Sequence, residues 1–455
     1  MRKVLLLMLL FVLSINAQAN TCNVNGLKYA LNHSTNEAVC MGFENEPTDF
    51  ISISVADYIT VADSQYKVIE IGGGAFFNCH YLQSIELPST LSKISFLAFA
   101  KCSNLENIVF PENLKVIERE AFALCTSLTS LYIPENVEEL GSTHAPNVFL
   151  ACSNLKSIKV SSKNAVFDSR KNCNAIIETS TNKIITGCST SKIVNGVEII
   201  GYRAFKQMLD LYELKIPSTV HTIEPTAFDG CPNINYITVS KHNAVYDSRE
   251  NCNAIIKTAT NTLCIGSNKT IIPDGIDTIG ACAFCGRTGL FNIAIPNSVK
   301  VIREFAFESC IYLNSVTLPI ELTQIYPSAF QNCIALSDVV FNENIERIGE
   351  SAFKNCILLQ EVVLPNSITQ IDFNAFEGCK ALTLLKLPDN DMCHILDNAF
   401  LGCSAIVELT IPFGVQHVGK NAFAYCSGIE NVHVKNSETE ISDSAFDSTV
   451  IINNM

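Results

Sequence analysis

Hydrophobic and polar residues alternate in short segments that recur along the chain about every 23 residues. In one unit, Ile85 and Leu87 flank the polar Glu86, so their side chains share one face of a short strand. Pro88 then ends the strand, because proline offers no N–H to a ladder of hydrogen bonds. The pair Ala75-Phe76 opens this unit, and equivalent pairs open the later ones. The pattern predicts a solenoid in which each turn contributes one strand and one internal Phe.

The spacing of the Phe residues defines the turns. Thirteen of them follow Ala, and one more, Phe149, follows Val148. Nine of the intervals between them are 23 residues, and each of the two intervals of 56 equals one turn plus 33 residues. The Phe positions are 76, 99, 122, 149, 205, 228, 284, 307, 330, 353, 376, 400, 423 and 446. We therefore expect 14 turns and two longer inserted coils, each burying its apolar face against the next.

The two long intervals contain a duplicated insert. Asn164–Arg170 is matched by Asn243–Arg249, and Asn172–Ile177 is matched by Asn251–Ile256. Each copy predicts short strands joined by polar turns, near residues 161–195 and 240–274. The Asp and Asn side chains of these inserts could ligate calcium, but hydrogen bonds within the turns explain the same residues, so no metal site is predicted.

The unit A-F-x-x-C-x-x-L-x-x-I-x-L-P-x-x-L-x-x-I resembles the BspA-like leucine-rich repeat of bacterial and protist surface proteins. The resemblance covers about residues 66–447. It implies a β-rich, right-handed leucine-rich-repeat solenoid with short parallel strands and 23-residue rungs. It also implies a surface protein that adheres to extracellular-matrix proteins.

The remaining segments suggest a secreted protein. Residues 1–19 combine Arg2 and Lys3, an apolar run and Ala17-Gln18-Ala19, which is typical of a cleaved signal peptide. No later segment is apolar for long enough to span a membrane. Residues 20–65 lack the repeat and are expected to form an N-terminal β cap, and residues 448–455 are expected to be a C-terminal tail.

Twenty cysteines in a secreted chain would normally suggest disulfides. Eleven of them, however, lie three residues after a repeat Phe, on successive turns about 4.8 Å apart. Their parallel Cβ directions suit a ladder of buried thiols better than disulfides. Cys22 and Cys40 lie in the cap and are a possible disulfide. Cys282 and Cys285 form a C-x-x-C, but Phe284 between them is a repeat residue, which favours a structural role.

Composition and motifs argue against several functions. The formal net charge of −14 disfavours nucleic-acid binding, which requires a basic face. Nucleophile, metal-protease and phosphate-loop motifs are absent from the sequence. We predict no enzymatic activity, no catalytic residues, no metal and no cofactor.

The exposed strand face is the candidate binding surface, because it presents variable side chains from every turn. Small and β-branched residues that merely suit a sheet account for most of it. The sharper hypothesis is a ligand-binding face in which aromatic side chains lie beside lysines. Its members are Tyr132, Lys159, Tyr212, Lys215, Tyr236 and Phe291. We expect the lysines to attract acidic partners.

The sequence thus predicts a secreted or cell-surface, non-catalytic scaffold, an adhesin for extracellular or host proteins. Two alternatives stay open. One is a glycan-binding module, suggested by the exposed Tyr and Phe residues, and the other is a purely structural component of the cell envelope.

Overall fold

The computed structural model describes residues 20–141, 147–390 and 392–454. The chain forms two compact units, Met1–Asp210 with Thr222–Ala227, and Leu211–His221 with Phe228–Met455. The described residues contain no α-helix and three short 3₁₀ segments, η2 (Arg170–Asn172), η3 (Arg249–Asn251) and η4 (Thr258–Thr260). The expected signal peptide, residues 1–19, lies outside the described residues.

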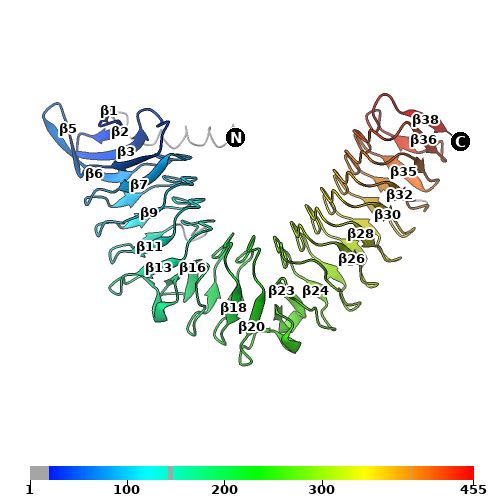
Figure 1. Ribbon diagram of the computed structural model, residues 1–455, viewed down its shortest axis with the longest axis horizontal. Helices are drawn as coiled ribbons and strands as arrows, with labels where there is room; N and C mark the ends of the chain where they lie inside the picture. Colours follow the sequence, from blue (N-terminus) through cyan, green and yellow to red (C-terminus); the bar gives the residue numbers. More distant parts are fainter. Residues whose placement is uncertain (1–19, 142–146, 391, 455) are drawn as a thin grey trace. The chain divides into compact units, whose positions relative to one another are not determined.

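The first unit consists of stacked turns that form parallel ladders (Figure 1). One eight-stranded sheet has the order β1-β2-β3-β6-β8-β10-β12, with β5 paired to β6. Its strands are β1 (Asn20–Val24), β2 (Leu27–Asn32), β3 (Glu37–Phe43), β5 (Tyr58–Val61), β6 (Ser64–Ile71), β8 (Lys93–Ile94), β10 (Val116–Ile117) and β12 (Glu139–Leu140). The other ladder contains β4 (Ile51–Ser54), β7 (Leu82–Glu86) and β9 (Asn107–Ile108), and then β11 (Ser130–Ile133) with β13 (Ser157–Val160). The first insert and the turns after it contribute β14 (Phe167–Asp168), β15 (Ala175–Glu178), β16 (Lys183–Gly187), β17 (Ile199–Ile200) and β19 (Thr222–Ile223).

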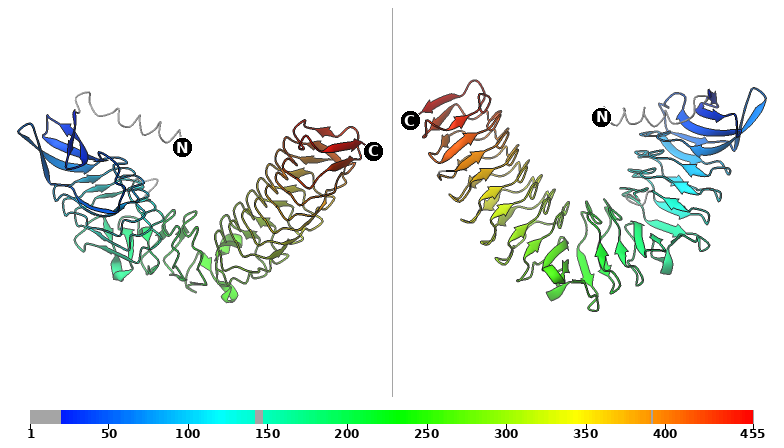
Figure 2. Two further views of the ribbon diagram at one scale, coloured as in Figure 1. Left: turned by 45° about the horizontal axis from the view of Figure 1, so that its top comes forward. Right: turned by 180° about the vertical axis from the view of Figure 1, so that it is seen from behind.

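The second unit repeats this arrangement over more turns, as the views in Figure 2 also show. Its long sheet comprises β21 (Tyr246–Asp247), β22 (Ala254–Lys257), β23 (Thr262–Gly266), β24 (Thr278–Ile279), β25 (Val301–Ile302), β27 (Gln324–Ile325), β29 (Arg347–Ile348), β31 (Gln370–Ile371), β33 (Cys393–Ile395), β35 (Val415–Val418) and β37 (Glu440–Ile441). The remaining strands carry the exposed strand face and pair in several short parallel sheets. They are β18 (Glu213–Ile216), β20 (Tyr236–Val239), β26 (Ser315–Thr317), β28 (Asp338–Val340), β30 (Glu361–Val363), β32 (Leu384–Lys386), β34 (Leu409–Ile411), β36 (Asn431–Val434) and β38 (Ile451–Asn454). The predicted leucine-rich-repeat solenoid is therefore confirmed.

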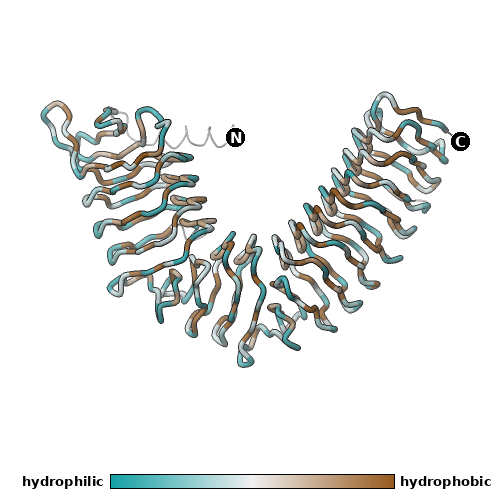
Figure 3. The backbone as a smooth tube through the Cα atoms, viewed as in Figure 1, coloured by the Kyte–Doolittle hydropathy of each residue, from teal (hydrophilic) through white to brown (hydrophobic). Residues whose placement is uncertain are grey.

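The repeat Phe residues form continuous stacks inside each unit. From Phe284 to Phe446, neighbouring rings lie 4.9–5.3 Å apart and within 8° of parallel. A second stack runs from Phe76 to Phe149 in the first unit. Figure 3 shows the result along the backbone, where hydrophobic (brown) segments recur at equivalent places in successive turns. The Phe stack is the repeated element around which the Leu and Ile side chains pack.

Every Ala-Phe turn except the last, that of Phe446, contains two residues with left-handed backbone. They are the second residue before the Phe and the second residue after it, such as Leu97 and Lys101 around Phe99. These residues let the chain turn sharply, so that the Phe99 N–H can donate to the Ala121 oxygen of the next turn at 2.8 Å.

Apart from the half-buried Cys79, the repeat cysteines are buried, and their thiols form no disulfide. They also donate hydrogen bonds, which sequence reasoning did not foresee. The Cys333 Sγ lies 3.1 Å from the Phe307 oxygen of the preceding turn, and Cys356 makes the same contact with Phe330 at 3.2 Å. Each such thiol therefore fills a small apolar space and also supplies a weak donor to a buried carbonyl.

The inserts interrupt the Phe stacks with glycine. A Cβ on Gly187 would lie 2.1 Å from the Phe205 ring, and a Cβ on Gly266 would lie 2.0 Å from the Phe284 ring. Each inserted coil thus lacks a repeat Phe and must leave room for the one of the next turn.

Strands near both ends of the chain join the ladders. Strand β4 pairs in parallel with β7, and β3 pairs in parallel with β6, so parallel pairing already begins within residues 20–65. Strands β1, β2 and β3 pair antiparallel and form the β-rich part that lacks the repeat. At the other end, β38 pairs in parallel with β36, so the segment expected to be a tail contains a further ladder strand.

Candidate binding surfaces

The six predicted face residues divide between the two units. Tyr132 and Lys159 are cross-strand partners on β11 and β13 in the first unit. The other four residues, Tyr212, Lys215, Tyr236 and Phe291, belong to the second unit. They are therefore treated as two separate surfaces.

In the second unit, Tyr212 and Tyr236 meet edge to face with their ring centroids 5.4 Å apart. Lys269, from the second insert, places its Nζ 2.9 Å from the Tyr236 hydroxyl and 4.8 Å from the centroid of the ring. The hydrogen bond from Lys269 lowers the pKa of Tyr236. The lysine beside these aromatic rings is therefore one that sequence reasoning missed, because it lies in the insert rather than on a ladder strand.

Phe291 also has an aromatic partner that was not predicted. Its ring stacks on Tyr312 with centroids 5.7 Å apart, and both side chains are about half exposed, at 55% and 50%. Tyr312 lies two residues before the position equivalent to Phe291 in its own turn, so the repeat register does not point to it. The Asn268 side chain donates to the Pro232 oxygen and accepts from the Gly289 N–H, which places the insert between the turns of Tyr236 and Phe291.

We define the aromatic surface as Tyr212, Tyr236, Lys269, Phe291 and Tyr312. Lys215 was expected to attract acidic partners, but its Nζ lies 2.8 Å from the Glu213 carboxylate on the same strand. This ion pair offsets its charge, so Lys215 contributes little attraction for anions.

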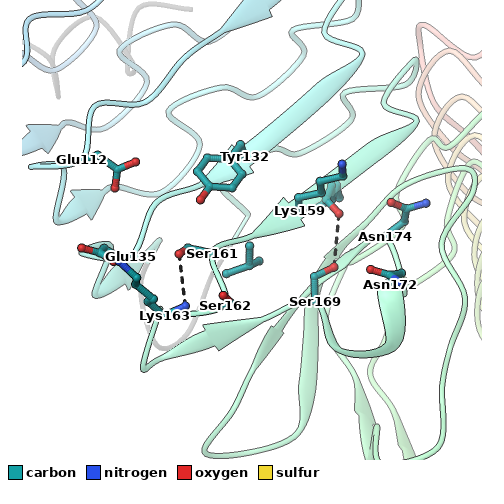
Figure 4. Close-up of a pocket in the computed structure, with 12 residues that line it drawn as sticks. Glu112, Tyr132, Glu135, Lys159, Ser161, Ser162, Lys163, Ser169, Asn172 and Asn174 are labelled. Atoms are coloured by element: carbon teal, nitrogen blue, oxygen red, sulfur yellow. Dashed lines mark hydrogen bonds and ion pairs between the residues drawn. The ribbon is translucent and has the colours of Figure 1, made fainter.

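In the first unit, Tyr132 and Lys159 line an open pocket of about 970 Å³ (Figure 4). The loops after the strands supply Glu112, Glu135 and Lys163, and the insert supplies Ser169, Asn172 and Asn174. Ser161, Ser162 and the aliphatic residues Ile158 and Val160 complete the lining. Figure 4 shows the two glutamates and the two asparagines on opposite sides, with Tyr132 projecting between them.

The conformation of the insert is fixed by internal hydrogen bonds. Asp168 is bidentate with Arg170, at 2.6–3.0 Å, and Arg170 also reaches the Asn182 side chain. The Asp247–Arg249 pair repeats this contact in the second insert. Each aspartate is already bound to an arginine of its own turn, so interactions within the turn account for the presence of these carboxylates. The described residues contain no group of three or more His, Cys, Asp or Glu side chains that could hold a metal ion.

Cys22 and Cys40 are not brought together. Cys22 on β1 is opposite Tyr29 on β2, and Tyr29 is opposite Cys40 on β3. Two strand spacings, roughly 10 Å, exceed the Cα separation of a disulfide, and both thiols are free in the structure. The two thiols of the C-x-x-C do interact, since a hydrogen bond between them lowers the pKa of Cys282 and raises that of Cys285.

Arg287 lies three residues after Phe284, in the slot that is usually Cys. It is 1% exposed, and burial lowers the pKa of its guanidinium. Its Nε donates to the Gly266 oxygen at 2.9 Å, and its Nη1 donates to the Cys231 and Cys285 oxygens. This side chain therefore links the second insert to the turns on either side of it.

Comparisons with known proteins agree with this architecture. The family model described as "BspA type Leucine rich repeat region (6 copies)" matches residues 56–176, 175–258, 254–383 and 347–455. No curated protein matches the chain. The structure also contains no helix, within its described ranges, with the length and apolar character needed to cross a membrane.

Several solved structures are similar at low sequence identity. A leucine-rich cell surface protein from Faecalibacterium prausnitzii is 24% identical, with a TM-score of 0.49, over 92% of this chain and 95% of that one. The pneumococcal vaccine antigen PcpA is 21% identical, with a TM-score of 0.44, over 96% and 94%. A leucine-rich repeat protein from Eubacterium ventriosum is 18% identical, with a TM-score of 0.45, over 90% and 95%. Because the family model covers most of the chain, including every Ala-Phe turn, the protein belongs to the BspA-type leucine-rich repeat family.

Proposed function

We propose that this protein is a secreted or cell-surface scaffold that binds extracellular or host proteins without catalysis and acts as an adhesin. The family assignment supports a surface-located binding scaffold. The observation that carries the proposal is the aromatic surface of the second unit, where four aromatic side chains that are 38–55% exposed form two contacting pairs.

The geometry of this surface suits protein recognition. Tyr212 and Tyr236 support one another, as do Phe291 and Tyr312, so little side-chain freedom is lost when a partner covers them. Aromatic side chains on a rigid support dominate the energetics of many protein interfaces. Lys269 adds a cation beside Tyr236 that a carboxylate of the partner can approach.

The test is binding of the chain from Asn20 onward to immobilised extracellular-matrix and plasma proteins at physiological salt. We expect saturable binding to at least one protein, and a loss of about tenfold or more in affinity for the double variant Tyr212→Ala/Phe291→Ala. Tyr425→Ala is the matched control, because Tyr425 is 73% exposed but lies beside an Ala-Phe turn rather than on the strand face.

Either of two results would reject the proposal. One is the absence of saturable binding to any protein of the panel, which would favour a structural role in the envelope. The other is binding that the double variant and the control reduce equally.

A further inference from the structure

The pocket of the first unit differs in chemistry from the aromatic surface. Its charged side chains are two glutamates and two lysines, so its formal charge is zero. Glu135 and Lys163 pair with each other at 3.4 Å, whereas Glu112 and Lys159 make no ion pair with any described residue. A carboxylate acceptor and an ammonium donor are therefore both available to a ligand.

The uncharged groups add further donors and acceptors. The Asn172 amide has no side-chain hydrogen-bond partner among the described residues, and the Tyr132 hydroxyl has none either. Asn174 uses its Nδ2 on Thr190 and keeps its oxygen available. The Ser162 hydroxyl is exposed beside them. A ligand in this pocket meets alternating donors and acceptors around one aromatic ring.

This combination identifies a class of ligand. The lining offers no deep apolar hole for a peptide side chain or an acyl chain, because Ile158 is 1% exposed and the other groups, apart from the half-buried Val160 and the Tyr132 ring, are polar. An anion would gain little from a lining with no net charge. A sugar fits both requirements, since each of its hydroxyls both donates and accepts, and its C–H face can pack on the Tyr132 ring. The volume is at the upper end of the usual range for ligand sites, ~300–1,000 Å³, and leaves room for more than one sugar ring.

The second insert provides an internal comparison. The cross-strand pair Tyr132 and Lys159 corresponds to Lys215 and Thr238, in the same register. The insert is attached to the strand in the same way in both copies. The Ser169 hydroxyl donates to the Ile158 oxygen at 3.4 Å, and the Ser248 hydroxyl donates to the Ile237 oxygen at the same distance. Only the first copy therefore carries the aromatic ring and the unpaired lysine at these strand positions.

We propose that the pocket formed by Glu112, Tyr132, Lys159 and Asn172 binds a short neutral oligosaccharide. Tyr132 packs against the sugar ring, Glu112 accepts from its hydroxyls, and Lys159 and Asn172 donate to them. The site is separate from the aromatic surface, so glycan binding and protein binding reside in different units of the chain.

The experiment uses the chain from Asn20 onward on an array of neutral di- to tetrasaccharides of hexoses and N-acetylhexosamines, with sulfated and sialylated sugars for comparison. Calorimetry then measures the affinity for the best neutral sugar. We expect binding that changes little between 50 and 500 mM salt. Tyr132→Ala should weaken it about five- to tenfold, and Asn172→Ala should also reduce it.

Lys215→Ala is the matched control, because Lys215 occupies the position of Tyr132 in the second copy. It should leave sugar affinity unchanged, as should the double variant Tyr212→Ala/Phe291→Ala. Tyr132 is 48% exposed, so its replacement should not lower the unfolding temperature. The proposal is overturned if no neutral sugar binds, if only sulfated or sialylated sugars bind, or if Tyr132→Ala and Lys215→Ala have the same effect.

Discussion

Truncation of one Phe in the centre of a stack should destabilise the protein far more than truncation of the Phe at its end. Phe353 is fully buried between Phe330 and Phe376, with ring centroids at 5.3 and 5.2 Å. Phe446 occupies the same slot of its turn, but only Phe423 stacks on it, at 5.3 Å, and it is 9% exposed.

The magnitudes follow from these contacts. A buried Phe→Ala change costs ~3–5 kcal/mol, which includes the cavity that remains. Phe353→Ala loses stacking on both faces of the ring, so its loss in free energy of unfolding should be near the upper end of this range, at about 5 kcal/mol. Phe446→Ala loses one stacked pair, worth ~0.5–1.5 kcal/mol, and its site can collapse toward solvent, so we expect about 2–3 kcal/mol.

The assay is urea unfolding followed by far-UV circular dichroism and by Tyr fluorescence, which is accessible because the chain has no Trp. Phe373→Ala serves as the control, since its side chain is 45% exposed and the change should cost less than about 0.5 kcal/mol. Equal losses for Phe353→Ala and Phe446→Ala would refute the reasoning, because the stack would then not couple one turn to the next.

Three further predictions concern the interior. Burial raises the pKa of Cys310 from 9.0 to about 12, so the thiol stabilises the fold below pH 9 and loses that contribution as the pH rises from 9 to 12. The urea midpoint of the unchanged protein should fall as the pH rises over this range, and the midpoint of Cys310→Ala should fall by less. An equal fall in both proteins would show that the Cys310 thiol does not cause the pH dependence. Gly266→Ala places a methyl group 2.0 Å from the Phe284 ring and should lower the free energy of unfolding, measured by thermal denaturation, by about 1–3 kcal/mol or more. Gly73→Ala is the control and should be nearly neutral, because the atom nearest to its Cβ would be the Phe96 oxygen at 3.5 Å. Arg287→Met and Arg287→Ala both leave three buried carbonyls without their donor. Arg287→Met keeps most of the side-chain volume, as Met208 does in the same slot after the first insert, and should cost about 1–3 kcal/mol. Arg287→Ala leaves a cavity as well and should cost about 3–5 kcal/mol. Equal losses for the two Arg287 variants would show that side-chain volume does not matter there.

The turn-by-turn architecture was predictable because stacking places residues 23 apart in the same environment. The Phe slot holds one residue type in every turn and the Ala and Cys slots do so in most turns, so the periodicity alone locates them. The left-handed positions around each Phe were not apparent, because residues as different as Leu97, Phe305 and Tyr425 occupy them. Their conformation is imposed by the packing of the turn rather than by local preference.

The binding surfaces were only partly predictable. The sequence identified exposed aromatic residues on the ladder, but their partners come from outside the repeat register. Lys269 belongs to an insert, and Glu213, which pairs with Lys215, lies on the same strand two residues away. The pocket also combines strand, loop and insert residues, and only the three-dimensional structure brings these together.

The hydrogen bonds and stacked rings that join neighbouring turns have a consequence for how the gene can change. Nearly every turn contacts only the turns before and after it, and equivalent backbone atoms are 23 residues apart in most cases. Unequal recombination between two Ala-Phe codons would therefore add or remove a whole turn and leave each junction with a complete set of partners. A shift of a few residues would instead misplace every buried side chain downstream. The length of the solenoid, and with it the area available for binding, can thus evolve in whole-turn steps.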